Sequence, residues 1–258
     1  MIRLGDGAEV RLRVHGIAHD VGAYERIGGL YETVLEDPAQ AIVAWKKRLE
    51  DDPADLSALS ALERLYERTS AHRELVGILR AREKEETDGA ARRRTLTKAA
   101  ETRADKLGDV PEAITAWRAV LDEFGPERPT LAALESLYEK AERWTDLEET
   151  LEVDLSLADD MADRLGLYAR LGDVRRLHQN NLRGALDAYR EALLLDPTSE
   201  RCRKALEAML DLPDARRDAA ETLRPLYEAD GDADHLLRVL EIQVATTEDP
   251  AERLTTLQ

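Results

Sequence analysis

Apolar residues recur along most of this chain at spacings of three and four, which is typical of helices with one buried face. Residues 55–69 give the plainest example, because Leu59, Leu62, Leu65 and Tyr66 form one stripe. Alternating or β-branched runs are rare, which argues against a sheet protein. Beyond the N-terminal stretch, the pattern predicts helices of roughly 12 to 20 residues joined by short turns.

The first predicted helices have recognisable ends. A helix over about 22–36 stops before Asp37-Pro38. That pair begins the second helix, because Asp caps helix N-termini and Pro suits the first helical position. The second helix ends near 51–53, a third covers about 55–69, and a fourth covers about 71–86. These four predicted helices complete one unit.

The segment that opens the second helix returns at an exact interval. Ala41, Ala113 and Ala185 are equally spaced, which is typical of a stacked-repeat protein, and we call the interval from one to the next a period. Leu75 and Leu147 occupy comparable positions between them and divide each period into a shorter and a longer step. The predicted structural unit is therefore a two-helix hairpin, and the sequence unit is a pair of hairpins.

The third unit departs from this period. The run that begins at Leu147 is matched by one that begins at Leu236. The interval between these two runs exceeds one period by about the length of one helix and its turn. We expect one added helix with its turn between Leu210 and Leu226, in a region where Pro225 would kink a helix. A capping feature, a bend and a partner-specific insertion are all compatible with this excess.

These positions resemble the tetratricopeptide repeat, a helix hairpin with fixed large and small residues. The third unit matches best, through Tyr168, Leu171, Gly172, Ala185, Tyr189, Ala192 and Asp196-Pro197. The alternate hairpins match only loosely. The resemblance implies an all-α fold: an α-solenoid, or right-handed superhelix of antiparallel helix hairpins, with about 13–14 helices. A HEAT-type helical repeat is the nearest rival fold.

The size of a side chain indicates its place where helices pack together. Gly28 and Ala41 are expected where two helices cross closely. Where the first unit has Tyr31, the later units have Arg103 and Arg175, which departs from the family pattern. Large rings are expected to fill the gap between successive hairpins, at Trp45, Trp117 and Tyr189.

We divide the chain into an irregular leader over 1–20 and a repeat array over 21–258. The array consists of units at about 21–90, 91–160 and 161–249, with the start of a further unit at 250–258. The leader does not follow the repeat, because Val10 to Val14 alternate like a short strand. No polar capping helix closes the array, which suggests a piece of a longer one.

The formal net charge of −17 disfavours a nucleic-acid partner, which requires clustered Lys and Arg. The acidic surface is compatible with a basic protein partner. Cys202, the single cysteine, lies in a helical pattern and is expected to be buried and inert. One cysteine, no signal-peptide core and no apolar run of membrane-spanning length together predict a cytoplasmic location.

The chain contains no phosphate loop, nucleophile elbow or paired-Cys motif, so we expect no enzyme, no catalytic residues and no cofactor. His15, His19 and Asp20 could form half of a metal site, but nothing else supports one and none is predicted. The run Arg92 to Arg94 fits an anion contact. Ion pairing with nearby glutamates such as Glu83 is the preferred reading. The Glu-rich run at 83–86 is expected to be a solvated face.

Tetratricopeptide arrays usually bind extended peptides or helices in a concave groove lined by the first helix of each hairpin. By resemblance, the candidates that face this groove are Glu25, Glu32, Ser60, Arg64, Arg68, Arg94, Thr97, Glu101, Ser136, Lys140, Asp173 and Arg176. We predict partner contacts at Arg64, Arg68, Arg94, Glu101, Ser136, Lys140 and Arg176. The carboxylate clamp of Lys and Asn used by some members is not visible on these faces.

The predicted function is therefore a noncatalytic protein–protein interaction scaffold that binds a peptide or protein partner in the groove. One alternative is a regulatory or docking segment of a larger multidomain protein, such as an enzyme or signalling protein. A purely structural spacer is a third hypothesis.

Overall fold

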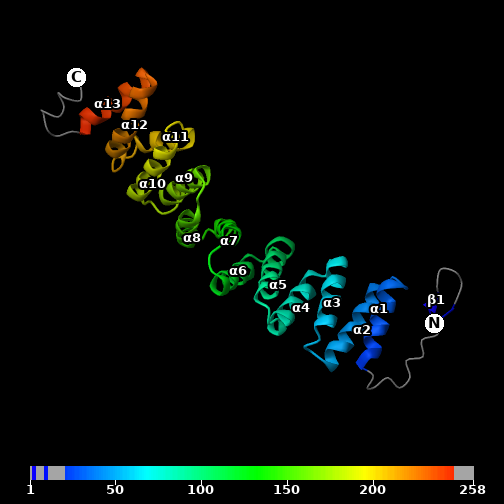
Figure 1. Ribbon diagram of the computed structural model, residues 1–258. Helices are drawn as coiled ribbons and strands as arrows, with labels where there is room; N and C mark the ends of the chain where they lie inside the picture. Colours follow the sequence, from blue (N-terminus) through cyan, green and yellow to red (C-terminus); the bar gives the residue numbers. More distant parts are fainter. Residues whose placement is uncertain (1, 4–8, 11–20, 247–258) are drawn as a thin grey trace. The chain divides into compact units, whose positions relative to one another are not determined.

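The computed structural model describes residues 2–3, 9–10 and 21–246, and this part of the chain is almost entirely helical (Figure 1). A π-helical turn, η1 (Thr102–Leu107), continues α5. The helices are α1 (Val21–Thr33), α2 (Pro38–Asp51), α3 (Leu56–Arg68), α4 (His72–Glu85), α5 (Gly89–Glu101), α6 (Val110–Phe124), α7 (Arg128–Lys140), α8 (Trp144–Leu157), α9 (Met161–Leu177), α10 (Leu182–Leu195), α11 (Glu200–Met209), α12 (Arg216–Asp230) and α13 (Ala233–Thr246). These 13 α-helices confirm the all-α hairpin array over the described range.

Two short strands are described before the first helix. Strand β1 (Ile2–Arg3) pairs antiparallel with β2 (Glu9–Val10). Only the first residue of the strand predicted at Val10 to Val14 is therefore described. The rest of that prediction lies outside the described residues, as do His15, His19 and Asp20.

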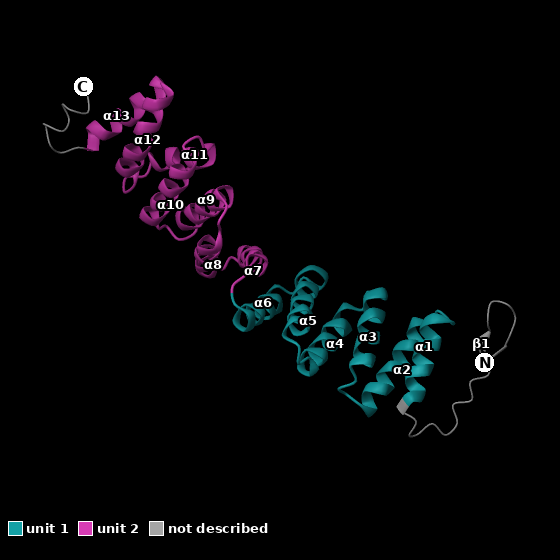
Figure 2. Cartoon of the chain, in the orientation of Figure 1, with its two compact units in different colours: residues 1–125 teal, residues 126–258 magenta. Residues whose placement is uncertain are grey.

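The chain divides into two compact units, residues 1–125 and 126–258 (Figure 2). The first unit contains the hairpins α1–α2, α3–α4 and α5–α6. The second contains α7–α8, α9–α10 and α12–α13, with α11 between the last two hairpins. The division falls between two hairpins, in agreement with the hairpin as the structural unit. The proposed unit limits at 90 and 160 stay predictions.

Side-chain caps recur one period apart, at the start of α2, α6 and α10. Asp37 accepts hydrogen bonds from the Ala39 and Gln40 N–H groups, each at 3.1 Å, and Pro38 takes the first helical position as predicted. Asp109 caps α6, and Asn181 caps α10. Each cap satisfies backbone N–H groups that lack a partner inside the helix, and so fixes where that helix begins.

Glycine permits the closest approach within two of the hairpins. A Cβ atom on Gly28 would lie 2.6 Å from Trp45 Nε1, and one on Gly172 would lie 2.4 Å from Tyr189 Cε1. The expectation of a small residue at a close helix crossing is confirmed at Gly28 and Gly172, but the ring that each one faces belongs to the same hairpin, which was not predicted. Trp45 also belongs to the buried cluster that contains Ala58 of the next hairpin, so the ring fills the seam between hairpins as well.

The added helix is α11, which lies earlier than predicted. Tyr138 in α7 and Tyr227 in α12 are both buried, and their spacing equals that of Leu147 and Leu236, so the hairpin α12–α13 repeats α7–α8. The predicted place between Leu210 and Leu226 was wrong. Leu206 in α11 still follows Leu134 by one period and is also fully buried, which hid the insertion. Pro225 lies inside α12, which continues to Asp230.

Candidate functional site

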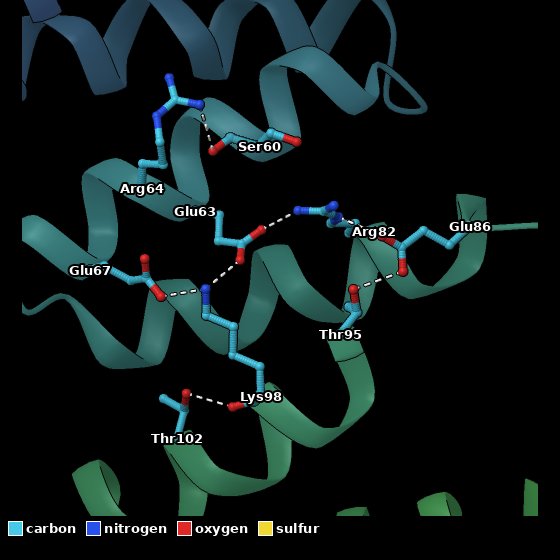
Figure 3. Close-up of polar contacts among 9 residues, drawn as sticks. All are labelled: Ser60, Glu63, Arg64, Glu67, Arg82, Glu86, Thr95, Lys98 and Thr102. Atoms are coloured by element: carbon cyan, nitrogen blue, oxygen red, sulfur yellow. Dashed lines mark hydrogen bonds and ion pairs between the residues drawn. The ribbon is translucent and has the colours of Figure 1, made fainter. Parts of the chain in front are cut away.

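A network of charged side chains joins α3, α4 and α5 in the first unit (Figure 3). Glu63 is only 8 % exposed, and its carboxylate accepts a hydrogen bond from Arg82 Nη1 at 2.5 Å. Its other oxygen accepts one from Lys98 Nζ, also at 2.5 Å. Lys98 pairs with Glu67 of α3 as well. Three successive helices are therefore tied together through one buried carboxylate.

The same network extends along α4 to the beginning of α5. Glu86 accepts hydrogen bonds from Arg82 Nε at 2.7 Å and from Thr95 Oγ1 at 2.7 Å. Its side chain is 5 % exposed. Burial by itself lowers the pKa of Arg82. The hydrogen bonds and charges of Glu86 and Glu63 raise the pKa by more than burial lowers it, so the net pKa is raised. The expectation that the run at 83–86 is a solvated face was wrong for Glu86, because its carboxylate is enclosed and hydrogen-bonded.

The second unit contains a related pair one period further on. Glu135 is 3 % exposed and accepts a hydrogen bond from Arg170 of α9. Burial raises the pKa of Glu135, although the Arg170 guanidinium lowers it in part. Arg170 thus stands where Lys98 stands in the first unit. The repeat therefore preserves a carboxylate and a cation at this contact between hairpins.

The predicted groove residues of the first unit lie on the solvent side of the first helices. Arg64 and Arg68 in α3 and Arg94 and Glu101 in α5 are all exposed. Arg64 lies apart from Glu63 in Figure 3 and pairs with Glu32 of α1 at 3.3 Å. These four side chains are thus accessible, and their role in binding stays a prediction.

The predicted residues of the second unit differ in accessibility. Ser136 and Lys140 in α7 are exposed. Arg176 in α9 is half-buried, and its Nε donates to the Tyr189 hydroxyl at 3.2 Å. That hydroxyl donates in turn to Asp173 at 2.7 Å. Burial, followed by the hydrogen bond to Asp173, raises the pKa of Tyr189. Arg176 therefore helps to hold the hairpin crossing, which makes it a weaker contact candidate.

The basic run at the start of α5 is mostly paired. Arg92 forms ion pairs with Glu83 at 3.0 Å and with Glu123 at 2.6 Å. Arg93 lies over the Phe124 ring, 5.0 Å from its centroid. The preferred reading of surface ion pairing is confirmed for Arg92, and Arg94 is left exposed.

The remaining candidate residues have structural environments. Cys202 is buried, and burial raises the pKa of its thiol, as expected for an unreactive cysteine. His178 stacks on Trp144 with ring centroids 3.5 Å apart, and His235 lies 2.8 Å from Asp232. Within the described residues, no group of three or more His, Cys, Asp or Glu is arranged to hold a metal ion. None of the described helices is both long and apolar enough to cross a membrane.

The environments of Arg103 and Arg175 were not predicted from the sequence, where both residues were noted only as departures from a tyrosine position. Arg175 donates to Glu148 at 2.6 Å and to Glu152 at 2.5 Å. Arg103 is buried without such a carboxylate partner in the described chain. The sequence contains a signal for this difference in partners. Arg80 stands one period before Glu152, so the first unit has a cation where the second has the carboxylate that pairs with Arg175.

Comparison with known proteins identifies one repeat directly. Residues 130–165 match the family model described as "Tetratricopeptide repeat". This segment covers nearly all of the hairpin α7–α8, not the segment at 168–197 whose residues resembled the family best. No curated protein matches the chain.

Several solved structures are similar to this chain. MamA from Desulfovibrio magneticus is 22 % identical, with a TM-score of 0.42 over 71 % of this chain and 98 % of that one. A tetratricopeptide repeat protein from Parabacteroides merdae is 14 % identical, with a TM-score of 0.42 over 91 % and 97 %. The C-terminal part of a repeat-containing protein from Cytophaga hutchinsonii is 11 % identical, with a TM-score of 0.41 over 91 % and 99 %.

The hairpin order, the repeated glycine-and-ring crossings and the family match agree with one another. Helical arrays of this kind present preformed surfaces on which other proteins bind. The described chain is a tandem array of tetratricopeptide-like helix hairpins.

Proposed function

We propose that the first helices of the hairpins form the partner-binding face and that the protein acts there without catalysis. The observation that carries this proposal is the two-sided character of α3. Its inward side chains, such as Leu59 and Leu62, are fully buried, whereas Arg64 and Arg68 face solvent. Packing therefore accounts for the inward residues and leaves the outward ones available to a partner.

The charged network supports this proposal by fixing the first helices in place. Glu63 of α3 is bonded to Arg82 of α4 and to Lys98 of α5. A buried carboxylate held from two neighbouring helices restricts how α3 and α5 can move relative to each other. A surface that is already ordered loses less entropy when a partner binds.

The proposed partner is a protein or peptide that makes many modest contacts along the first helices. Nucleic acid is disfavoured, since the chain carries a net charge of −17 and phosphate binding depends on clustered cations. Within the first unit the contact residues are Arg64, Arg68, Arg94 and Glu101. In the second unit they are Ser136 and Lys140.

Charge reversal tests the proposal. The variant carrying Arg64→Glu, Arg68→Glu and Arg94→Glu is compared with one carrying Arg73→Glu, Lys84→Glu and Arg118→Glu. Both sets are exposed and change the net charge equally, but the second set lies on the second helices α4 and α6. Affinity capture followed by mass spectrometry, at low and moderate salt, then measures how much of each partner is recovered.

The first variant should lose partners that wild-type protein retains, by about tenfold or more if roughly 1.4 kcal/mol of binding free energy is lost. The second variant should retain them. Equal recovery by wild type and both variants, or loss confined to the second variant, would place the binding face elsewhere.

A further inference from the structure

Arg103 is a buried cation on an unusual backbone segment. Arg103 lies in the π-helical turn η1, and the residue is only 8 % exposed. Arg103 Nη1 donates to the Ala99 carbonyl oxygen at 3.3 Å. No carboxylate in the described chain is hydrogen-bonded to this guanidinium, which has several further N–H donors.

The equivalent residue one period later has a different environment. Arg175 occupies the matching position in the second unit and is bonded to both Glu148 and Glu152. The first unit has Arg80 at the position that corresponds to Glu152. Arg103 therefore has a second cation where Arg175 has a carboxylate.

Electrostatics leave the cation at Arg103 incompletely compensated. Burial, followed by the charge of Arg80, lowers the pKa of Arg103. Glu112, Asp109 and Glu83 act in the opposite direction through their charges but do not outweigh these effects. Glu83 is also committed to Arg92. An anion between the two arginines would compensate both charges, as Glu152 does for Arg175.

Arg103 and Arg80 line a cavity of about 170 Å³ within the first unit. The rest of its wall combines the carboxylates Glu83 and Glu112 with apolar groups that include Leu96, Ala99, Ala116 and Ala119. A cavity of roughly 150 Å³ can hold a molecule as large as benzene. The space therefore suits an anionic group that carries a short apolar stem.

We propose that this cavity binds a monocarboxylate on a short aliphatic stem. The carboxylate lies between Arg80 and Arg103, and the stem packs against Leu96, Ala99 and the α6 alanines. Glu83 and Glu112 in the wall disfavour a second negative charge, which selects against phosphate and dicarboxylates. The source is either a free organic acid or a glutamate side chain of a bound protein. This site is separate from the exposed first-helix residues.

Isothermal titration of the full chain with butanoate, at constant ionic strength, tests the proposal. Butanamide serves as the uncharged isostere, and N-acetylglutamate amide serves as the mimic of a partner's side chain. Saturable binding of butanoate or of the glutamate mimic, with no binding of butanamide, is expected. Butanoate binding indicates a free acid as the source, whereas binding of the mimic alone indicates a protein side chain.

The decisive variant is Arg80→Glu, which recreates in the first unit the carboxylate present at Glu152. It should weaken carboxylate binding at least tenfold and raise the thermal midpoint of unfolding. Arg73→Glu is the matched control, since Arg73 is also exposed on α4 and the charge change is the same. This control should bind like wild type. Absence of carboxylate binding to wild type, equal binding of butanamide, or undiminished binding in Arg80→Glu would overturn the proposal.

Discussion

At two helix crossings, the aromatic ring opposite the residue limits the size of the side chain that fits there. Gly172 in α9 has no room for a Cβ, because Tyr189 Cε1 would lie 2.4 Å from it. Gly166, in the same helix, would place its Cβ in open space. The two glycines therefore separate the effect of packing from the general effect of glycine on a helix.

Gly172→Ala should destabilise the protein by about 1–3 kcal/mol, because the added methyl group forces Tyr189 or the backbone to move. Gly166→Ala should instead stabilise it by about 0.5–1 kcal/mol, since alanine loses less backbone entropy in a helix. Urea denaturation followed by circular dichroism measures both. Destabilisation of the same size in both variants would show that the ring contact is not the cause.

The repeat predicted the apolar residues far better than the charged ones. The small size of Gly28 and the large ring of Trp45 could be assigned to packing from the sequence, although their mutual contact was not predicted, because close packing leaves few sizes that fit a crossing. The environment of Arg103 was not predicted, since it depends on whether the previous hairpin supplies Arg80 or a glutamate. Charged partners can change sign between repeats without altering the apolar period, as Arg80 and Glu152 do, so the apolar period alone does not predict them.

At the scale of a helix, Asp55 combines an N-cap with an ion pair. Its carboxylate accepts the N–H groups of Ser57 and Ala58 and lies 2.5 Å from Arg48 Nε. Burial raises the pKa of Asp55, but the Ala58 N–H and the Arg48 guanidinium more than offset it, so the net pKa lies below 3.8. Asp37 provides a comparison, because it caps α2 through the same pattern of two N–H groups.

Asp55→Ala should cost about 1–2 kcal/mol at neutral pH, and Asp55→Asn should cost less because asparagine also caps helices. The folded pKa is below the unfolded value, so the carboxylate stabilises the fold above about pH 3.8. This contribution is lost as the pH falls through the folded pKa. Urea unfolding between pH 7 and acid should therefore show wild type converging on Asp55→Ala. A constant difference over this range would contradict the assignment.

Helix boundaries were predictable where a cap or proline marks them, as at Asp37-Pro38. The added helix was misplaced for a different reason. Leu206 in α11 preserves the apolar period, although α11 has no hairpin partner of its own. The sequence shows that a position is buried, whereas only the helix contacts show which neighbour buries it.

At the scale of the molecule, the hairpin array and its division into compact units set the form of the proposed binding face. Hairpins are arranged in chain order within each unit. The first helices α1, α3 and α5 recur at regular intervals in the first unit, whereas α11 lengthens the interval between α9 and α12 in the second. The resemblance predicted this order and the solvent exposure of Arg64, Arg68, Arg94, Glu101, Ser136 and Lys140. The identity of a partner could not be predicted, because the repeat constrains only the inward residues.

Site-specific photocrosslinking to a captured partner tests the proposed face most directly. A photoreactive phenylalanine replaces Arg68 or Arg94 on the first helices, and Arg73 or Arg118 on the second helices. All four positions are exposed in the first unit. The proposed face predicts partner crosslinks from Arg68 and Arg94 and few or none from Arg73 and Arg118. Crosslinks of equal yield from both pairs, or only from the second-helix pair, would contradict it.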